Sequence, residues 1–370
     1  MTKLDQLLEQ WNGMQPFSAA DYAKLERKFK IEFNYNSNHI EGNALTYGQT
    51  ELLLLFGEVV GSANMKDLEE MKAHDVCLKM MQEEAAEKEK PLTEVFIRQL
   101  HHVMLREDYS VTRKLPSGSI TTHTVHAGTY KTRPNSIITR TGERFEYASP
   151  EETPSLMYDL VNWYNKAESA GNLSPIELAA LFHYKYIRIH PFEDGNGRIA
   201  RLIMNFILLR HGYPMIVIRS KTKDKYLEAL HKADIVTGPV PSDGAQATLE
   251  QIKAFTSYLQ NVTEKEIADK IRYISDASES IWLYNGDFIK FRSPNTGKIL
   301  DAITAEPDIT VRALTEKIGI NKSAIQKQLD SLKEKGYIVK SSENRGVWHV
   351  AIVRTTEKGG TTPNGGTKRM

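Results

Sequence analysis

Residues 190–201 read HPFEDGNGRIAR, a glycine-rich segment with helical patterns on either side of it. On its N-terminal side, apolar residues recur at helical spacing after a start signal at residues 174–177, where a capping serine is followed by proline and then by glutamate. Pro191 disfavours helical geometry in the residue before it, so this helix is expected to end there. A second helix is expected to open after Gly197 and to stop at Gly212. Two helices therefore flank one glycine-rich loop.

The loop has the composition of an anion site. Gly195 and Gly197 let the backbone turn tightly and approach a ligand closely. The helix that follows presents free N–H groups and a positive dipole end, which together favour a bound phosphate. Arg198 and Arg201 lie three residues apart, so they share one face of this helix and can address phosphate oxygens through their planar forks.

Two further side chains add reactivity to this site. Asp194 is a hard oxygen ligand, suited to a Mg²⁺ ion that bridges phosphates. His190 has an ordinary pKa of about 6.5, which suits a general base at neutral pH. A base, a metal ligand, an anion site and two arginines are what nucleotidyl or phosphoryl transfer needs, because such catalysis is largely positioning and charge stabilisation.

The stretch resembles the signature of the Fic family, His-Pro-Phe-x-Asp/Glu-Gly-Asn-Gly-Arg-x-x-Arg, at every position from 190 to 201. The likeness extends over about residues 30–235 and implies a helical core that transfers AMP from ATP–Mg²⁺ to a protein hydroxyl. It also implies a role for each residue of the loop. His190 deprotonates the hydroxyl, Asp194 binds Mg²⁺, Gly195, Asn196 and Gly197 cradle the phosphates, Arg198 and Arg201 hold the outer phosphates, and Phe192 packs the loop onto the core.

Two segments outside the signature resemble other parts of a Fic site. A hairpin expected around residues 134–147 is similar to the family's flap, whose strand, here including Ile137, Ile138 and Thr139, pairs with an extended target segment. Tyr226 resembles the tyrosine that contacts adenine in relatives, and an aromatic residue of the helix core is the alternative interpretation.

Residues 37–43, SNHIEGN, resemble the family's inhibitory motif. On a helix, Ser37 and Glu41 share a face at a spacing of four residues. The resemblance implies that Glu41 pairs with Arg201, removes it from the γ-phosphate and so inhibits the enzyme in cis. Some relatives use this glutamate to remove AMP from a modified target, and that role stays open here. Self-modification is also implied.

The chain divides into regions of different character. We expect an N-terminal helical region with the inhibitory helix (1–105), the Fic core (106–235), a helical linker region (236–296), a winged helix-turn-helix (297–355) and a disordered tail (356–370). The fold class is therefore mainly α, with a β-hairpin flap and a small C-terminal winged domain. The winged module has 10 Lys/Arg and 7 Asp/Glu, a mild excess that leaves DNA, a protein partner and dimerisation open.

Composition restricts the partners and the cellular location that we expect for this chain. The formal net charge is +1, from 48 basic and 47 acidic residues, and gives no global attraction to nucleic acid or an anionic membrane. One cysteine, Cys77, excludes an intrachain disulfide. No apolar run approaches the ~18 residues of a membrane span, and the N-terminus has no apolar signal segment, so a cytoplasmic protein is expected.

Three other functions compete with AMP transfer. The core could sense a nucleotide without catalysis and serve a DNA-binding regulator. The pair His74-Asp75 prompts a metal-dependent hydrolase, but it stands alone among helix-forming charges. Some members of the family move UMP, phosphate or phosphocholine, and the signature does not encode the base.

Overall fold

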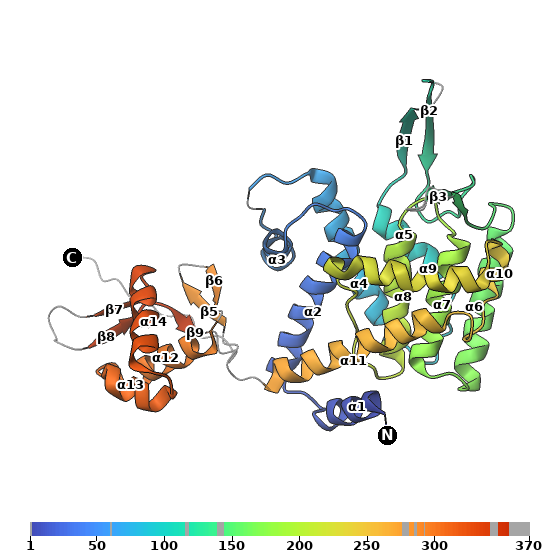
Figure 1. Cartoon of the computed structure of the whole chain (residues 1–370). Helices are drawn as coiled ribbons and strands as arrows, with labels where there is room; N and C mark the ends of the chain where they lie inside the picture. Colours follow the sequence, from blue (N-terminus) through green and yellow to red (C-terminus); the bar gives the residue numbers. More distant parts are fainter. Residues whose placement is uncertain are drawn as a thin grey trace. The chain divides into compact units, whose positions relative to one another are not determined.

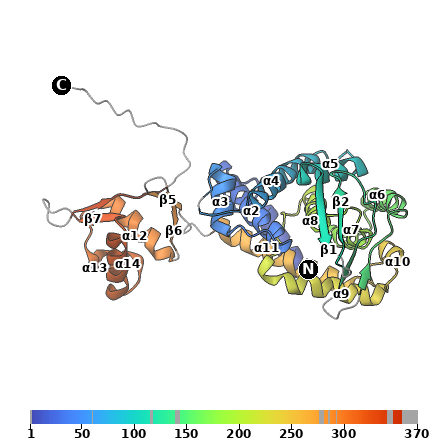
Figure 2. The ribbon, with the colours of Figure 1, turned by 90° about the horizontal axis from the view of Figure 1, so that it is seen from above.

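The computed structural model describes residues 2–59, 61–114, 118–138, 144–275, 281–284, 287–291, 293–340 and 347–354. Contacts between residues divide the chain into two compact units, Met1–Lys270 and Ile271–Met370. Figures 1 and 2 show the chain coloured from its N-terminus to its C-terminus. The expected boundaries of the five regions stay predictions, and each unit is described by itself.

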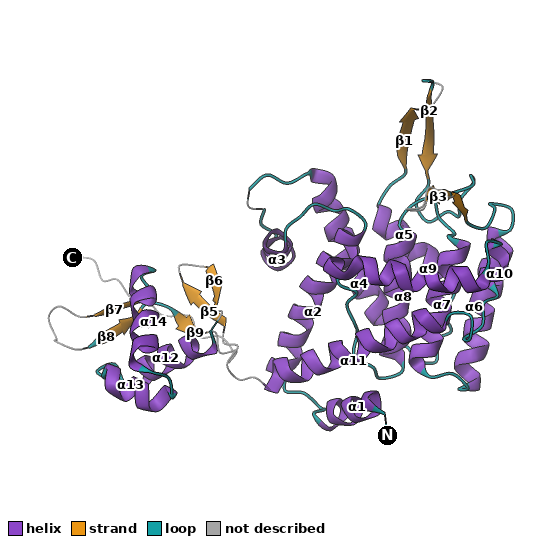
Figure 3. Cartoon of the chain, in the orientation of Figure 1, coloured by secondary structure: helices purple, strands orange, loops and turns teal. Residues whose placement is uncertain are grey.

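The first unit is built mainly from helices (Figure 3). Their bounds are α1 Lys3–Gly13, α2 Ala19–Ile40, α3 Tyr47–Phe56, α4 Met65–Ala86, α5 Glu94–Leu105, α6 Thr153–Ala170, α7 Pro175–Ile189, α8 Asn196–Arg210, α9 Lys223–Thr237, α10 Pro241–Ala245 and α11 Lys253–Ser275, with a short 3₁₀ turn η1 at Ser220–Thr222.

Helices α7 and α8 form the centre of the unit and pack against each other, with α4 on α8 and α6 on α7. The expected capping box is present at the start of α7, where Ser174 accepts from the N–H of Glu177 and the Glu177 side chain accepts in return. Most residues of both helices are buried in one hydrophobic core. The expectation of two helices around one glycine-rich loop is confirmed, and the loop is held by the most buried part of the unit.

In the described part of the first unit, two hairpins interrupt the helices. Strands β1 (Tyr109–Lys114) and β2 (Ile120–Val125) pair antiparallel and project from the helical body (Figure 1). We did not predict this first hairpin. The second hairpin pairs β3 (Ser136–Ile138) with β4 (Arg144–Glu146), where the flap was expected.

The second unit contains the winged helix-turn-helix. Helices α12 (Pro294–Ala305), α13 (Val311–Ile318) and α14 (Lys322–Glu334) pack around a core of their own, and β7 (Ile338–Lys340) pairs with β8 (Trp348–Val350). The caps of α13 and α14 are Thr310 and Asn321. The expected tail, 356–370, lies outside the described residues.

The expectation that residues 236–296 are helical is wrong near its end. Strands β5 (Ile281–Tyr284) and β6 (Asp287–Lys290) form a hairpin there, and β9 (Val353–Arg354) pairs with β5. Apolar and aromatic residues of this stretch suit strands, and the sequence between β5 and β6 is Asn285-Gly286, a pair typical of hairpin turns. Among the described residues, no helix combines the length and apolar character needed to cross a membrane.

Candidate active site

The loop between α7 and α8 has a shape that its own side chains maintain. His190 ends α7 in the left-handed region (φ 51°, ψ 61°), and Gly195 begins α8 with a φ of 77°. The Asn196 side chain spans the loop, because its Oδ1 accepts from the N–H of Phe192 at 3.0 Å and its Nδ2 donates to the Phe192 carbonyl at 2.7 Å. The Asn196 amide is thus committed to the loop itself.

Phe192 is fully buried and fastens the loop to α5, as the resemblance implies. Its ring stacks on His101 with centroids 3.7 Å apart. His101 Nδ1 faces the N–H of Gly128 at 2.8 Å, so Nε2 carries the proton and donates to the Asp194 carbonyl at 3.0 Å. Burial lowers the pKa of His101 to about 4, so the ring stays neutral. We did not predict this histidine.

His190 is half-buried on the pocket wall and is held from three sides. The ring stacks on Tyr147 with centroids 4.0 Å apart. Its Nδ1 lies 2.8 Å from Nδ2 of Asn135 and 3.2 Å from Nδ2 of Asn196. Burial and the nearby Lys131 ammonium lower the pKa of His190 to about 3, although Asp194 opposes the shift. The ring is therefore neutral at physiological pH, as a base must be.

Asp194 fits the role of a magnesium ligand. Its Oδ2 accepts from the Tyr109 hydroxyl at 2.7 Å, and its Oδ1 accepts from the N–H of Gly195. Burial raises the pKa of Asp194, but Arg198 and these hydrogen bonds outweigh it, so the pKa falls below its usual value and the carboxylate stays charged. Within the described part of the chain no cluster of three or more metal-binding side chains occurs. A single carboxylate suits Mg²⁺ that is carried by substrate phosphates.

Arg198 and Arg201 are both almost fully buried at the start of α8. Arg198 Nη2 lies 3.6 Å from Oδ2 of Asp194, and Arg198 Nη1 lies 4.0 Å from Oε2 of Glu70 on α4. The two guanidinium groups thus flank the helix start, where an anion would meet free N–H groups.

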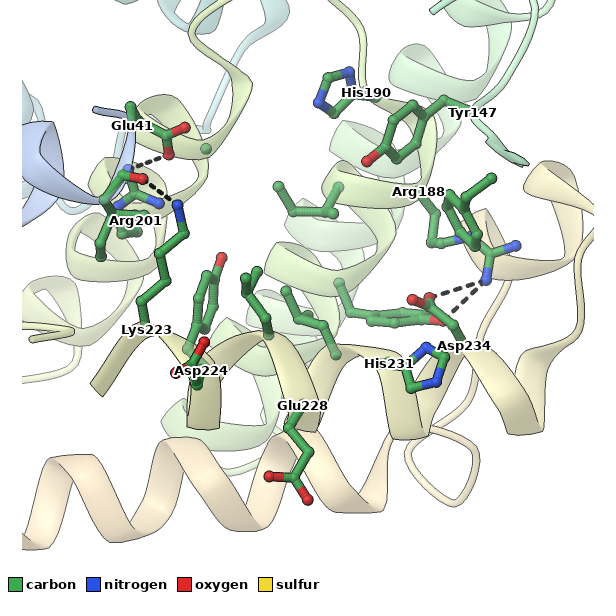
Figure 4. Close-up of a pocket in the computed structure, with 18 residues that line it drawn as sticks. Glu41, Tyr147, Arg188, His190, Arg201, Lys223, Asp224, Glu228, His231 and Asp234 are labelled. Carbon is green, nitrogen blue, oxygen red and sulfur yellow. Dashed lines mark hydrogen bonds and ion pairs between the residues drawn. The ribbon is translucent and has the colours of Figure 1, made fainter. Parts of the chain in front are cut away.

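The expected inhibitory residues meet Arg201 directly (Figure 4). Glu41, which caps the C-terminus of α2, places Oε1 2.6 Å from Nη2 of Arg201. Ser37, one turn earlier, accepts from Nε of Arg201 at 3.0 Å, and its carbonyl accepts from Nη2 at 2.9 Å. A Cβ at Gly197 would collide with the Glu41 carboxylate, so glycine is required for this approach.

A pocket of about 570 Å³ opens between this ion pair and α9. Glu41 and Arg201 line one end, and Tyr147, Arg188 and Asp234 lie at the other (Figure 4). Tyr226, the expected adenine contact, also lines this pocket and is 3% exposed. Its hydroxyl lies 2.8 Å from His183 Nε2 in the core, so its contact with a base stays a prediction.

The expected docking strand is present only in part. Ile137 and Ile138 lie in β3. Thr139 lies outside the described residues. The expectation that a target segment pairs with this strand therefore stays a prediction.

Two family models match the chain. The Fic/DOC family matches residues 91–208, and the winged helix-turn-helix DNA-binding family matches residues 292–339. Both matches coincide with the elements that the structure places around the signature loop and in the second unit.

Relatives agree with these matches. A Fic domain containing signaling protein from Bacteroides thetaiotaomicron is 53% identical in structure-based comparison, with a TM-score of 0.69, and covers 74% of this chain and 97% of its own. The chain belongs to the Fic/DOC family. Protein adenylyltransferase fic-1 from Caenorhabditis elegans is 29% identical over 301 residues, 81% of this chain and 52% of that protein. Protein adenylyltransferase Fic from Nematostella vectensis is 31% identical over 54% of this chain and 42% of its own length. The chain thus spans about half the length of the curated relatives it matches.

Proposed function

We propose that this chain is a protein adenylyltransferase, which moves AMP from ATP to a Ser, Thr or Tyr hydroxyl of a target protein and of itself. One observation carries the proposal. The loop and the start of α8 carry His190, Asp194, Arg198 and Arg201; His190 and Arg201 line a pocket of about 570 Å³, and Arg198 lies 3.6 Å from Asp194. Relatives named as protein adenylyltransferases support the same reaction.

The chemistry follows from these positions. His190 takes the proton of the hydroxyl, whose oxygen attacks the α-phosphorus of ATP. The bond from that phosphorus to the oxygen bridging to the β-phosphate breaks, and pyrophosphate leaves with the electron pair. Arg198 and Arg201 hold the outer phosphates, and the free N–H groups of α8 bind phosphate oxygens. Mg²⁺, held by Asp194 and the phosphates, would neutralise charge on the leaving group.

Glu41 serves as the brake in this proposal. Its carboxylate occupies the arginine that the γ-phosphate needs, at 2.6 Å, and would repel that phosphate as well. ATP then binds in a pose that does not react. Removal of AMP, in which the same carboxylate would direct a water molecule, is a separate activity. Incubation of AMP-modified protein with the wild type would reveal it.

The reaction class is tested with labelled nucleotides. We expect Glu41→Gly protein with Mg²⁺ to acquire label from ATP marked at the α-phosphate and none from ATP marked at the γ-phosphate, because the proposed bond forms at the α-phosphorus. Label from the γ-position would instead mean phosphate transfer. Excess unlabelled UTP or CTP should not compete as well as ATP. A chain that binds ATP but acquires neither label would be a nucleotide sensor.

For the second unit we propose DNA binding through α14. Lys322, Gln326 and Lys327 are exposed on the first turns of this helix, which is the part that enters the major groove in such folds. The matching family model is described as DNA-binding. Dimerisation or a protein partner at this unit are the competing roles, and they predict no affinity for duplex DNA.

Lys327→Glu should weaken binding of the full chain to duplex DNA and lower the salt dependence of that binding by about one unit of slope if Lys327 contacts one phosphate. Fluorescence anisotropy at several salt concentrations measures both. Lys265→Glu, at an exposed lysine on α11 of the first unit, is the matched control and should change neither. Equal effects of the two substitutions would rule out a specific role for α14.

A further inference from the structure

A chain of hydrogen bonds reaches His190 from the segment before the flap. Lys131 Nζ donates to Asn135 Oδ1 at 2.9 Å, and Asn135 Nδ2 lies 2.8 Å from His190 Nδ1. Lys131 is itself anchored, because Nζ also donates to the Ile189 carbonyl at 2.9 Å and its backbone N–H donates to the Pro191 carbonyl at 2.8 Å. Lys131 is only 3% exposed, so this anchor lies inside the protein.

The partners of Asn135 fix which way its amide points. Its Oδ1 faces an ammonium group, which can only donate. Its Nδ2 lies 3.0 Å from the Phe192 carbonyl, which can only accept. Asn135 therefore presents an N–H group to His190, and the reversed amide would place two acceptors together.

Asn196 presents a second N–H group to the same ring nitrogen. Its amide is oriented by Phe192, whose N–H and carbonyl contact Oδ1 and Nδ2, respectively, and Nδ2 lies 3.2 Å from Nδ1 of His190. A ring nitrogen that faces two donors must carry a lone pair. The neutral ring then carries its proton on Nε2.

This tautomer has a consequence for the proposed reaction. A general base must accept the proton of the hydroxyl on a free ring nitrogen. In the arrangement described, Nδ1 is occupied by two donors and Nε2 already carries a proton. His190 is therefore held as a proton donor. In the same structure Glu41 also holds Arg201, which is the inhibited arrangement of the proposed function.

We propose that Asn135, aligned by Lys131, is a positioning residue that holds His190 in its proton-donating tautomer, and that Nδ1 can accept a proton when Asn135, the nearer of its two donors at 2.8 Å against 3.2 Å for Asn196, moves away. This inference rests on the proposed function. Asn135 directly precedes β3, so a target segment that pairs with β3 would act on the residue that restrains the base. The chain would then have two restraints, one on the phosphate-binding arginine and one on the base.

The kinetic test uses Glu41→Gly as its background, with Asn135→Leu as a variant of similar size that has no donor. We expect the acid limb of kcat to move to higher pH by about one unit, and kcat at neutral pH to rise up to about tenfold, because one hydrogen bond that opposes a proton on Nδ1 is lost. Asn135→Asp adds a negative charge as well as an acceptor, so it should move the limb further in the same direction, and Asn135→Leu is the variant that isolates the loss of the donor. The charged groups that act on the ring, Lys131 and Asp194, stay in place, as does the stacked Tyr147.

A merely structural asparagine predicts something different, namely loss of kcat in Asn135→Leu with an unchanged acid limb, and that result would overturn the proposal. If Glu41→Gly alone transfers no AMP, the proposed function fails. The proposed restraint on His190 can then still be tested by a second measurement, which does not require AMP transfer.

That measurement is the tautomer itself. Long-range ¹H–¹⁵N correlations of the histidine side chains, assigned by comparison with His190→Ala, report which ring nitrogen carries the proton. In the wild type at neutral pH we expect Nδ1 of His190 to be unprotonated and Nε2 to be protonated. We expect Asn135→Asp, whose carboxylate can accept from Nδ1, to place the proton on Nδ1 in part of the protein, because Asn196 still opposes it at 3.2 Å. A proton on Nδ1 in the wild type would contradict the inference.

Discussion

Glu41→Gly is expected to raise AMP transfer by about 10- to 100-fold. The substitution removes the carboxylate that lies 2.6 Å from Arg201 and leaves the Ser37 contacts of that arginine in place. A hydrogen bond between charged groups is worth about 1.5–3 kcal/mol, and each 1.4 kcal/mol corresponds to about a tenfold change in the population of the productive pose. Arg201 becomes available to the γ-phosphate, and the negative charge that opposes that phosphate is gone.

The measurement is the growth of the AMP adduct on the intact protein, followed by mass spectrometry in ATP and Mg²⁺. Glu41→Gln separates two causes, because it removes the charge and keeps a hydrogen-bonding group, and an intermediate rate is expected. Glu250→Gly is the control at an exposed glutamate that does not line the pocket, and its rate should equal that of the wild type. Wild-type and Glu41→Gly rates that agree within a factor of two would mean that this ion pair is not the brake.

The sequence predicted the parts of the site that are local in the chain. The signature loop is continuous, so its glycines, arginines and histidine could be placed from spacing alone. Ser37 and Glu41 are separated from Arg201 by more than 150 residues, and only the family resemblance linked them. Their spacing of four residues predicted a shared helix face, and the contacts of Ser37 with Arg201 are known from the structure alone.

The supporting residues were missed because nothing in the sequence joins them to the loop. Tyr109 reaches Asp194 from 85 positions away, His101 reaches the same residue from 93, and Asn135 reaches His190 from 55. Each is an ordinary polar residue in its own segment. The first hairpin was missed although its strands contain valine, isoleucine and threonine, which favour strands.

His190→Ala in the Glu41→Gly background is expected to lower AMP transfer by about 10²- to 10⁴-fold, which is the usual contribution of a positioned general base. The fold should survive, because Asn196 and Phe192 maintain the loop without the imidazole. Binding of ATP should change little, since the arginines and the start of α8 are untouched. Calorimetric titration with ATP and the rate of adduct growth separate these two effects.

His211→Ala is the matched control for that loss. His211 caps the end of α8, as His190 caps the end of α7, but it is exposed and does not line the pocket. We expect its rate to equal that of the parent. A His190→Ala protein that keeps its rate would show that the hydroxyl loses its proton to another group, such as water or a substrate phosphate. A variant that loses ATP binding in equal measure would instead assign His190 to the nucleotide site, because a base acts on the hydroxyl and leaves the affinity for ATP unchanged.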